Sequence, residues 1–176
     1  MATDRVRRPA TESEARTLAS AVRLRILRLC LDDELTNKEI ADRLGRDPAS
    51  VLHHVRRLVD DGFLQALPPR RGRRGARERP YRATRKSWEL SQSDVEVVGQ
   101  SSDAMLQAFL AEAAEAGTLK SASRLGLTLG PEQLEEFLDR LQDVFDEYAR
   151  RPPDPDGIRW SVFFAMHRDR RGVHPE

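Results

Sequence analysis

Two short helical patterns, separated by a tight turn, restrict the fold of this chain more than any other feature of its sequence. Thr36 followed by Glu39 is a capping-box pattern that predicts the start of one helix. Gly45 is of the residue type that commonly ends a helix. Asp47 followed by Pro48 predicts the start of the next helix, because proline's missing N–H costs nothing at the first helical position. The sequence therefore predicts a helix-turn-helix.

The second of these helices is predicted to run from Pro48 to about Asp61 and to have two chemically different faces. Its buried stripe is expected to consist of Val51, Val55, Leu58 and Val59. The opposite face begins with small residues, which let a helix approach the base edges of DNA closely. The residues expected to contact bases are Ala49, Ser50, Leu52, His53 and Arg56. For Leu52, at the margin of the apolar stripe, packing in the core and contact with a thymine methyl group both remain open.

Two adjacent histidines, His53 and His54, raise the question of a metal site on this helix. Neighbouring positions on a helix point about 100° apart, so the two rings do not converge on one ion. We therefore expect DNA contact or helix packing from them.

An arginine-rich hairpin is predicted to follow the helix directly. Gly62 ends the helix, residues 63–67 have a strand pattern, and residues 80–84 form the return strand. Between them lies a turn-rich tip whose cations suit phosphates or an A·T-rich minor groove. The residues expected to contact the DNA backbone are Arg46, Arg57, Arg70, Arg71, Arg73, Arg74, Arg77 and Arg79. The alternative is a solvated loop whose charge serves solubility, but its position beside a helix-turn-helix favours DNA contact.

The charge of the chain is divided unevenly between its two halves, although the total is only +1. Residues 1–90 contain 21 Lys+Arg and 13 Asp+Glu, a net charge of +8, whereas residues 91–176 contain 9 and 16, a net charge of −7. Eight of the 16 residues from 70 to 85 are arginine. This asymmetry indicates that the first half binds a polyanion and that the second half has a different role.

Three elements of the first half resemble one bacterial family. The RLRIL motif at 23–27, the EIADRLG motif at 39–45 and the VLHHVRRLVDDGFL motif at 51–64 together resemble the ArsR-like winged-helix regulators, over about residues 12–88. The resemblance implies a dimeric repressor that binds an imperfect palindrome. Residues 1–10 are then a basic arm and residues 11–90 a winged helix-turn-helix domain, with a capping-box pattern at Thr11 opening the first helix.

The chain departs from the metal-sensing members of that family. They carry a cysteine pair in the helix where this sequence has Thr36 and Lys38. The one cysteine, Cys30, cannot supply the several thiolates that zinc or a softer metal needs, and it is best explained as a small buried hydrophobe. We therefore expect the non-metal-sensing type, with no metal and no cofactor. No apolar stretch is long enough to span a membrane, so a cytoplasmic protein is expected.

The acidic half, residues 91–176, is expected to form a dimerisation or sensor region. A helix from about 91 to 116 is followed by an alternating segment at 123–129, an amphipathic helix at 131–150 and a strand at 158–168. Strand, helix and strand predict a small βαβ unit, which makes the whole chain mainly α with a little β structure (α+β). The residues expected to form a dimer core or a pocket for an unknown small effector are Tyr148, Trp160, Phe163, Phe164 and Met166.

Taken together, these patterns predict a sequence-specific transcriptional regulator. It would act as a homodimer on double-stranded DNA with a palindromic operator, and as a repressor. The sequence has no nucleophile–base pair and no phosphate-cradling loop, so an enzyme is not expected. The alternative is a winged-helix adapter that binds a protein partner, for which the arginine tip would have no use.

Overall fold

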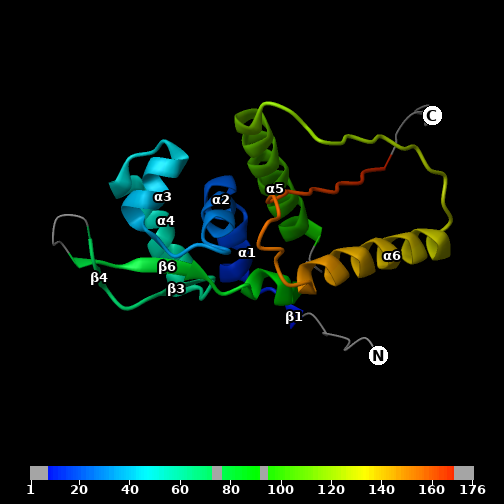
Figure 1. Ribbon diagram of the computed structural model, residues 1–176. Helices are drawn as coiled ribbons and strands as arrows, with labels where there is room; N and C mark the ends of the chain where they lie inside the picture. Colours follow the sequence, from blue (N-terminus) through cyan, green and yellow to red (C-terminus); the bar gives the residue numbers. More distant parts are fainter. Residues whose placement is uncertain (1–7, 73–76, 92–94, 169–176) are drawn as a thin grey trace. The chain divides into compact units, whose positions relative to one another are not determined.

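A computed structural model describes residues 8–72, 77–91 and 95–168 of the 176-residue chain (Figure 1). The chain divides into two compact units, Met1–Gly117 and Thr118–Glu176. We call them unit 1 and unit 2 and describe each by itself.

Unit 1 begins with four short helices, and local capping signals set their limits. They are α1 (Glu12–Leu18), α2 (Ala21–Leu29), α3 (Asn37–Leu44) and α4 (Pro48–Asp60). The capping boxes predicted at Thr11 and Thr36 are both present. The carboxylate of Asp47 accepts a hydrogen bond of 2.9 Å from the backbone N–H of Ser50. Gly45 ends α3 with a φ of 61°, in the left-handed region that favours glycine. The predicted helix-turn-helix is confirmed.

The helices are held together by one hydrophobic core to which the predicted apolar faces contribute. Ile26 and Cys30 follow the apolar face of α2, and Val51, Val55 and Leu58 follow that of α4. All of them are fully buried, and the core is extended by the side chains of Leu18, Leu35, Ile40, Ala41, Leu44, Phe63, Leu64 and Leu90. Burial of each large apolar side chain stabilises the folded state by about 1.5–3 kcal/mol.

The predicted hairpin forms directly after α4 and is part of a three-stranded antiparallel sheet. Strand β3 (Leu64–Ala66) pairs with β6 (Pro80–Ala83), which also pairs with β2 (Leu35–Thr36). In this sheet Leu64 lies opposite Ala83 and Leu35 lies opposite Tyr81. Farther out, β4 (Arg70–Arg71) pairs with β5 (Arg77–Glu78), so the hairpin continues as a narrow ribbon. We call residues 64–83 the wing.

Two short elements connect the wing to the last helix of unit 1. A 3₁₀ helix, η1 (Lys86–Glu89), precedes β7 (Leu90–Ser91), which pairs in parallel with β1 (Arg8–Pro9) near the N-terminus. Helix α5 (Val95–Ala116) then packs against α1 and α2. Small side chains, Ala104 and Ala108, are buried where α5 meets these helices.

Unit 2 contains helix α6 (Pro131–Arg150), as the amphipathic pattern predicts. The predicted βαβ unit is wrong, because the flanking segments at 123–129 and 158–168 form no strand in the described chain. An alternating pattern favours an extended backbone, but a strand is stable only when a neighbouring strand accepts its hydrogen bonds. Most apolar side chains of these segments are consequently exposed, with Leu125 at 75% and Val162 at 72%, whereas Leu129 and Phe163 are half-buried. The broader α+β class is confirmed by the helices and small sheets of unit 1.

Candidate nucleic-acid interface

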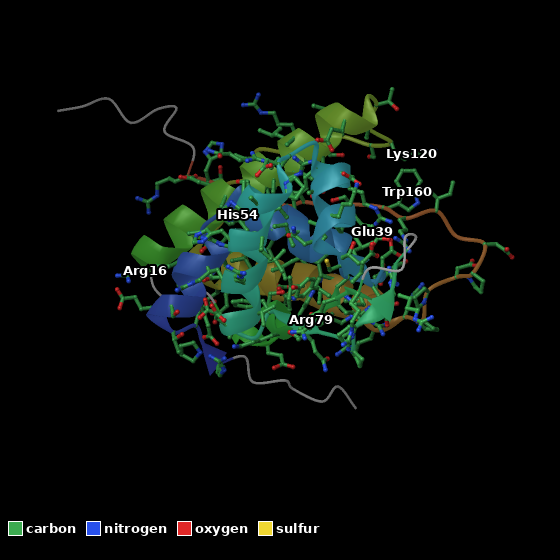
Figure 2. All side chains as sticks on the ribbon, turned by 90° about the vertical axis from the view of Figure 1, so that its left-hand side faces the viewer. Arg16, Glu39, His54, Arg79, Lys120 and Trp160 are labelled. Carbon is green, nitrogen blue, oxygen red and sulfur yellow. The ribbon has the colours of Figure 1, made fainter. Side chains whose placement is uncertain are left out.

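Helices α3 and α4 and the wing lie on the same side of unit 1. This side is on the left in Figure 1 and faces the viewer in Figure 2. The arrangement follows from the core, because Val51 and Val55 hold one face of α4 inward and leave the other face outward. The outward face of α4 and the basic hairpin therefore lie on the same side of unit 1.

The outward face of α4 carries the residues predicted to contact bases. Ala49, Ser50, His53 and Arg56 are exposed, whereas Leu52 is half-buried. Arg56 forms no ion pair or hydrogen bond within the described residues. The first turn of α4 is fastened to α3 by Asn37, whose Nδ2 donates a hydrogen bond of 2.8 Å to the carbonyl oxygen of Pro48. The hydrogen bond from Asn37 therefore holds the first turn of α4 in place, although its outward side chains are small or polar and contribute little packing.

His54, which is labelled on α4 in Figure 2, lies outside that outward face and is half-buried. Burial lowers the pKa of His54, and the nearby charges of Arg23, His53 and Arg46 lower it further. The ring is therefore neutral at pH 7. Its Nδ1 atom is buried and has no hydrogen-bond partner in the described chain. Among the described residues, no group of three or more His, Cys, Asp or Glu could hold an ion, and the absence of a metal stays a prediction.

The wing presents several cations that the protein itself does not neutralise. The side chains of Arg71, Arg77 and Arg79 are exposed and form no ion pair or hydrogen bond in the parts of the chain that the structure covers. The side chain of Arg46, before α4, is likewise exposed and forms no ion pair or hydrogen bond within the described residues. Arg70 differs, because its Nη2 lies 3.3 Å from Oε2 of Glu39 on α3. Predicted contact residues Arg73 and Arg74 lie outside the described residues.

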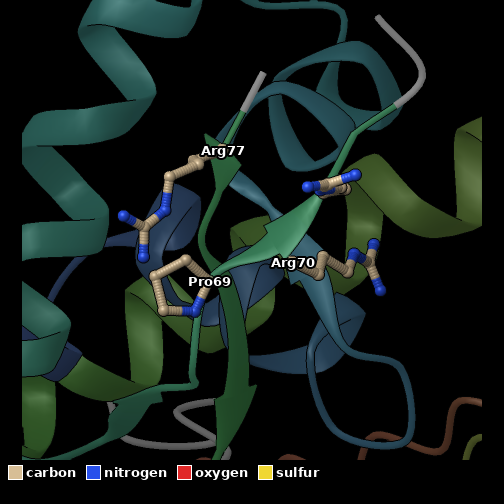
Figure 3. A pocket seen from close by; sticks show the side chains of 4 residues that line it. Pro69, Arg70 and Arg77 are labelled. Atoms are coloured by element: carbon tan, nitrogen blue, oxygen red, sulfur yellow. The ribbon is translucent and has the colours of Figure 1, made fainter. Parts of the chain in front are cut away.

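Figure 3 shows the part of the wing that carries Arg70, Arg71 and Arg77. Pro69, Arg70, Arg71 and Arg77 line one hollow on the β4–β5 ribbon. A hollow lined by guanidinium groups attracts anionic oxygens, which each Arg can bind through two N–H groups at once.

Arg57 occupies a different environment from the other predicted contacts. Its Nε donates a hydrogen bond of 2.9 Å to Oγ1 of Thr17, and its Nη2 donates one of 2.8 Å to Oγ of Ser13. Nε also lies 3.0 Å from Oδ2 of Asp61. Sequence reasoning missed Ser13 and Thr17, because no local pattern marks contacts between residues 40 or more positions apart. It also missed Asp61, although the spacing of four residues from Arg57 is a local sign of an ion pair on a helix.

The second polar cluster that the sequence did not reveal surrounds Glu14. Its carboxylate accepts hydrogen bonds of 2.6 and 2.9 Å from Arg8, and it lies 2.8 Å from Nζ of Lys86. The hydrogen bond from Arg8, opposed by burial and reinforced by Lys86 and Thr11, holds the pKa of Glu14 far below its usual range. The capping-box pattern predicted the contact of Glu14 with the backbone of Thr11, at 2.8 Å, but gave no sign of the two cations.

The residues of unit 2 that are predicted to form a pocket or dimer core are largely exposed. Tyr148, Trp160, Phe164 and Met166 are exposed, and Phe163 is half-buried. The ring of Phe164 lies 6.3 Å from that of Phe137 on α6. Their role as a pocket or a dimer core stays a prediction. None of the described helices is both long and apolar enough to cross a bilayer.

Comparison with known proteins adds one family match. A family described as a helix-turn-helix domain matches residues 18–65, the segment from the end of α1 to β3. No curated protein matches the chain. The match is to helix-turn-helix domains in general, so the ArsR-like resemblance stays a prediction.

Several solved structures are similar to parts of the chain. Reduced HlyU from Vibrio cholerae N16961 shares 23% identity over 56% of this chain and 84% of its own, with a TM-score of 0.35. The transcriptional regulator Tm0710 from Thermotoga maritima shares 20% identity over 74% of this chain and 75% of its own, with a TM-score of 0.32. The PcaV transcriptional regulator from Streptomyces coelicolor shares 16% identity over 76% and 78%, with a TM-score of 0.32.

Proposed function

We propose that this chain is a sequence-specific DNA-binding transcriptional regulator and not an enzyme. One observation carries the proposal: the exposed face of α4 and the unpaired arginines of the wing lie on the same side of unit 1. The match of residues 18–65 to a helix-turn-helix domain supports it. Helix α4 enters the major groove, and the wing contacts the flanking backbone.

The two parts of this interface contribute differently to binding. Ser50 and His53 hydrogen-bond to base edges and Arg56 reaches a guanine, which gives discrimination between sequences. Arg71, Arg77 and Arg79 neutralise phosphates, which gives affinity for any duplex and makes it depend on salt. Arg46, at the turn before α4, adds a further phosphate contact.

The regulator acts as a homodimer on a palindromic operator, and the ArsR-like resemblance implies repression. Support for a self-contact comes from apolar side chains that a single copy leaves exposed. On α5, Leu106 and Leu110 lie one helical turn apart and are 40% and 56% exposed. On α6 the apolar stripe contains no buried residue. A second copy that covers such faces removes apolar area from water.

The test is a binding titration of the full chain against a labelled random duplex. Binding should weaken steeply as salt is raised from about 50 mM to about 200 mM. Selection from a random-sequence pool should then yield a palindromic site that binds more tightly than the random duplex at equal salt. If the chain binds no duplex even at the lower salt, the DNA-binding function is wrong and a protein-binding adapter takes its place.

A further inference from the structure

Asp61, the residue that follows α4, gathers polar groups from three separate elements. Its Oδ1 accepts a hydrogen bond of 2.8 Å from Oγ of Ser13, and its Oδ2 accepts one from Oγ1 of Thr17. Both donors belong to α1. Its backbone carbonyl accepts a hydrogen bond of 2.5 Å from Nζ of Lys86, which lies after the wing. The side chain of Asp61 is only 12% exposed.

Asp61 is ionised in this environment. Burial raises the pKa of its carboxyl group, but hydrogen bonds from Thr17 and Ser13 and the charges of Arg57 and Lys86 outweigh that effect. The pKa of Asp61 is therefore lowered from its ordinary value. A buried carboxylate with this many donors fixes the positions of the elements that supply them.

Arg57 completes the cluster and turns its guanidinium toward α1. It spans Thr17, Ser13 and Asp61 at distances of 2.8–3.0 Å. Its chain neighbour Arg56 points about 100° away around the helix and is exposed. Two adjacent arginines on one helix therefore lie in different surroundings: Arg57 is hydrogen-bonded in a polar cluster, with its side chain still 42% exposed, and Arg56 faces solvent.

The base of the wing is fastened to the same place. Oγ1 of Thr84, just after β6, donates a hydrogen bond of 2.8 Å to the carbonyl oxygen of Gly62. Lys86 reaches Asp61 from η1 and also pairs with Glu14 on α1. The end of α4, the base of the wing and α1 thus meet within one hydrogen-bonded cluster, which leaves little freedom in the angle between the helix and the wing.

We propose that Asp61 and Arg57 are positioning residues of the DNA interface, and that Arg57 is not a phosphate contact. They hold the end of α4 against α1 and the base of the wing, so that the helix and the wing meet one duplex in a fixed geometry. This inference rests on the proposed DNA-binding function. It assigns Arg57 a role opposite to the one that its charge and position in the sequence indicate.

The salt dependence of DNA binding separates the two roles of Arg57. The probes are a duplex selected from a random pool by the wild-type full chain, and a random duplex of equal length. A phosphate contact contributes about 0.9 to the slope of log K against log salt. We expect Arg57→Ala to leave the slope unchanged and to weaken binding of the selected duplex about tenfold, the equivalent of about 1.4 kcal/mol. The matched control, Arg77→Ala in the wing, should lower the slope by about 0.9.

Two further variants distinguish positioning from a charge contact and from stability alone. Arg57→Lys keeps the charge, but one ammonium cannot span the three groups that the guanidinium joins, so it should behave as Arg57→Ala does. Asp61→Asn should likewise reduce binding of the selected duplex more than that of the random duplex. A purely structural role would lower the melting temperature and leave the preference for the selected duplex unchanged in the folded protein.

The outcomes are distinct. If Arg57→Ala lowers the salt slope as Arg77→Ala does and Arg57→Lys restores it, Arg57 is a phosphate contact and the positioning role is overturned. An unchanged preference for the selected duplex in the Asp61→Asn variant overturns it equally. Failure of the wild-type chain to bind any duplex is a different result, because it removes the DNA-binding function itself.

Discussion

The side chain of Asn37, the first residue of α3, donates a hydrogen bond to the carbonyl oxygen of Pro48, the first residue of α4. The two helices of the motif are therefore joined at their N-terminal ends by a side chain as well as by the turn. We expect Asn37→Ala to lower the free energy of unfolding by about 0.5–1.5 kcal/mol. Asn37→Asp should lower it further at pH 7, because a carboxylate has no donor and faces the carbonyl oxygen. Urea unfolding of the three proteins measures this order of stability. An Asn37→Asp variant as stable as the wild type would contradict the prediction.

Helix caps offer a matched pair of substitutions. Oγ1 of Thr36 accepts a hydrogen bond of 3.2 Å from the backbone N–H of Glu39, whereas Ser20, at the same position before α2, makes no side-chain cap. Thr36→Ala should therefore lower the free energy of unfolding by about 1 kcal/mol. Ser20→Ala should change it by less than about 0.5 kcal/mol. Equal effects in denaturant titrations would show that the cap at Thr36 contributes nothing.

The acid response of the Glu14 cluster has a definite sign. The pKa of Glu14 is lowered in the folded chain, so its stabilising effect is complete above the unfolded value of about 4.3 and is lost as the pH falls below it. Glu14→Gln should be less stable than the wild type at pH 7, because Arg8 and Lys86 lose their shared carboxylate. The difference in stability between the two proteins should become smaller as the pH is lowered from about 5 toward 3. The measurement is the melting temperature of both proteins across that pH range. A difference in melting temperature that does not change with pH would rule out the ionised carboxylate as its cause.

The thiol of Cys30 provides a probe of unit 1. The side chain is fully buried, and burial raises its pKa to about 12. We expect no reaction with a thiol reagent at pH 8 in the native chain and prompt reaction once the chain is unfolded in denaturant. Rapid labelling under native conditions would mean that α2 opens without global unfolding.

The proposed homodimer depends on the apolar positions of α5 and α6. Leu110→Asp and Val144→Asp place a charge on side chains that one copy leaves more than half exposed. Both variants should remain folded and shift from dimer to monomer in analytical ultracentrifugation, because an unpaired charge at an interface is costly to bury. Arg140→Ala, on the charged face of α6, is the control and should leave the dimer intact. A wild-type chain that sediments as a monomer would remove the dimer from the proposal.

The parts of unit 1 that depend on neighbours in sequence could be predicted, and those that depend on distant partners could not. Thr36, Gly45 and Asp47 each act within a few residues, so the sequence alone predicted α3 and α4 correctly. The contacts of Asp61 with Ser13 and Thr17 join residues 48 and 44 positions apart, which no local pattern encodes. The contact of Arg57 with DNA stays a prediction from its charge, whereas its hydrogen bonds to Thr17 and Ser13 depend on the packing of α1 and could not be read from the sequence.

The failed prediction in unit 2 has a related cause. Residues 123–129 alternate between apolar and other side chains, and such alternation shows that a segment can be extended with one apolar face. It carries no information on which strand will pair with it. In α4 the apolar stripe packs into the core of the same unit, so the sequence pattern alone was sufficient to predict which face is buried.

Acidic residues of unit 1 already neutralise part of the arginine-rich segment. Arg70 pairs with Glu39, Arg82 lies 3.9 Å from Glu34, and Arg85 lies 3.5 Å from Asp32. Glu39, Glu34 and Asp32 lie outside the wing, and each reduces the attraction of the arginine-rich segment for polyanions. We expect that replacing Glu34 or Asp32 with a neutral residue would leave Arg82 or Arg85 without its acidic partner and so raise the attraction of this segment for polyanions without an additional arginine.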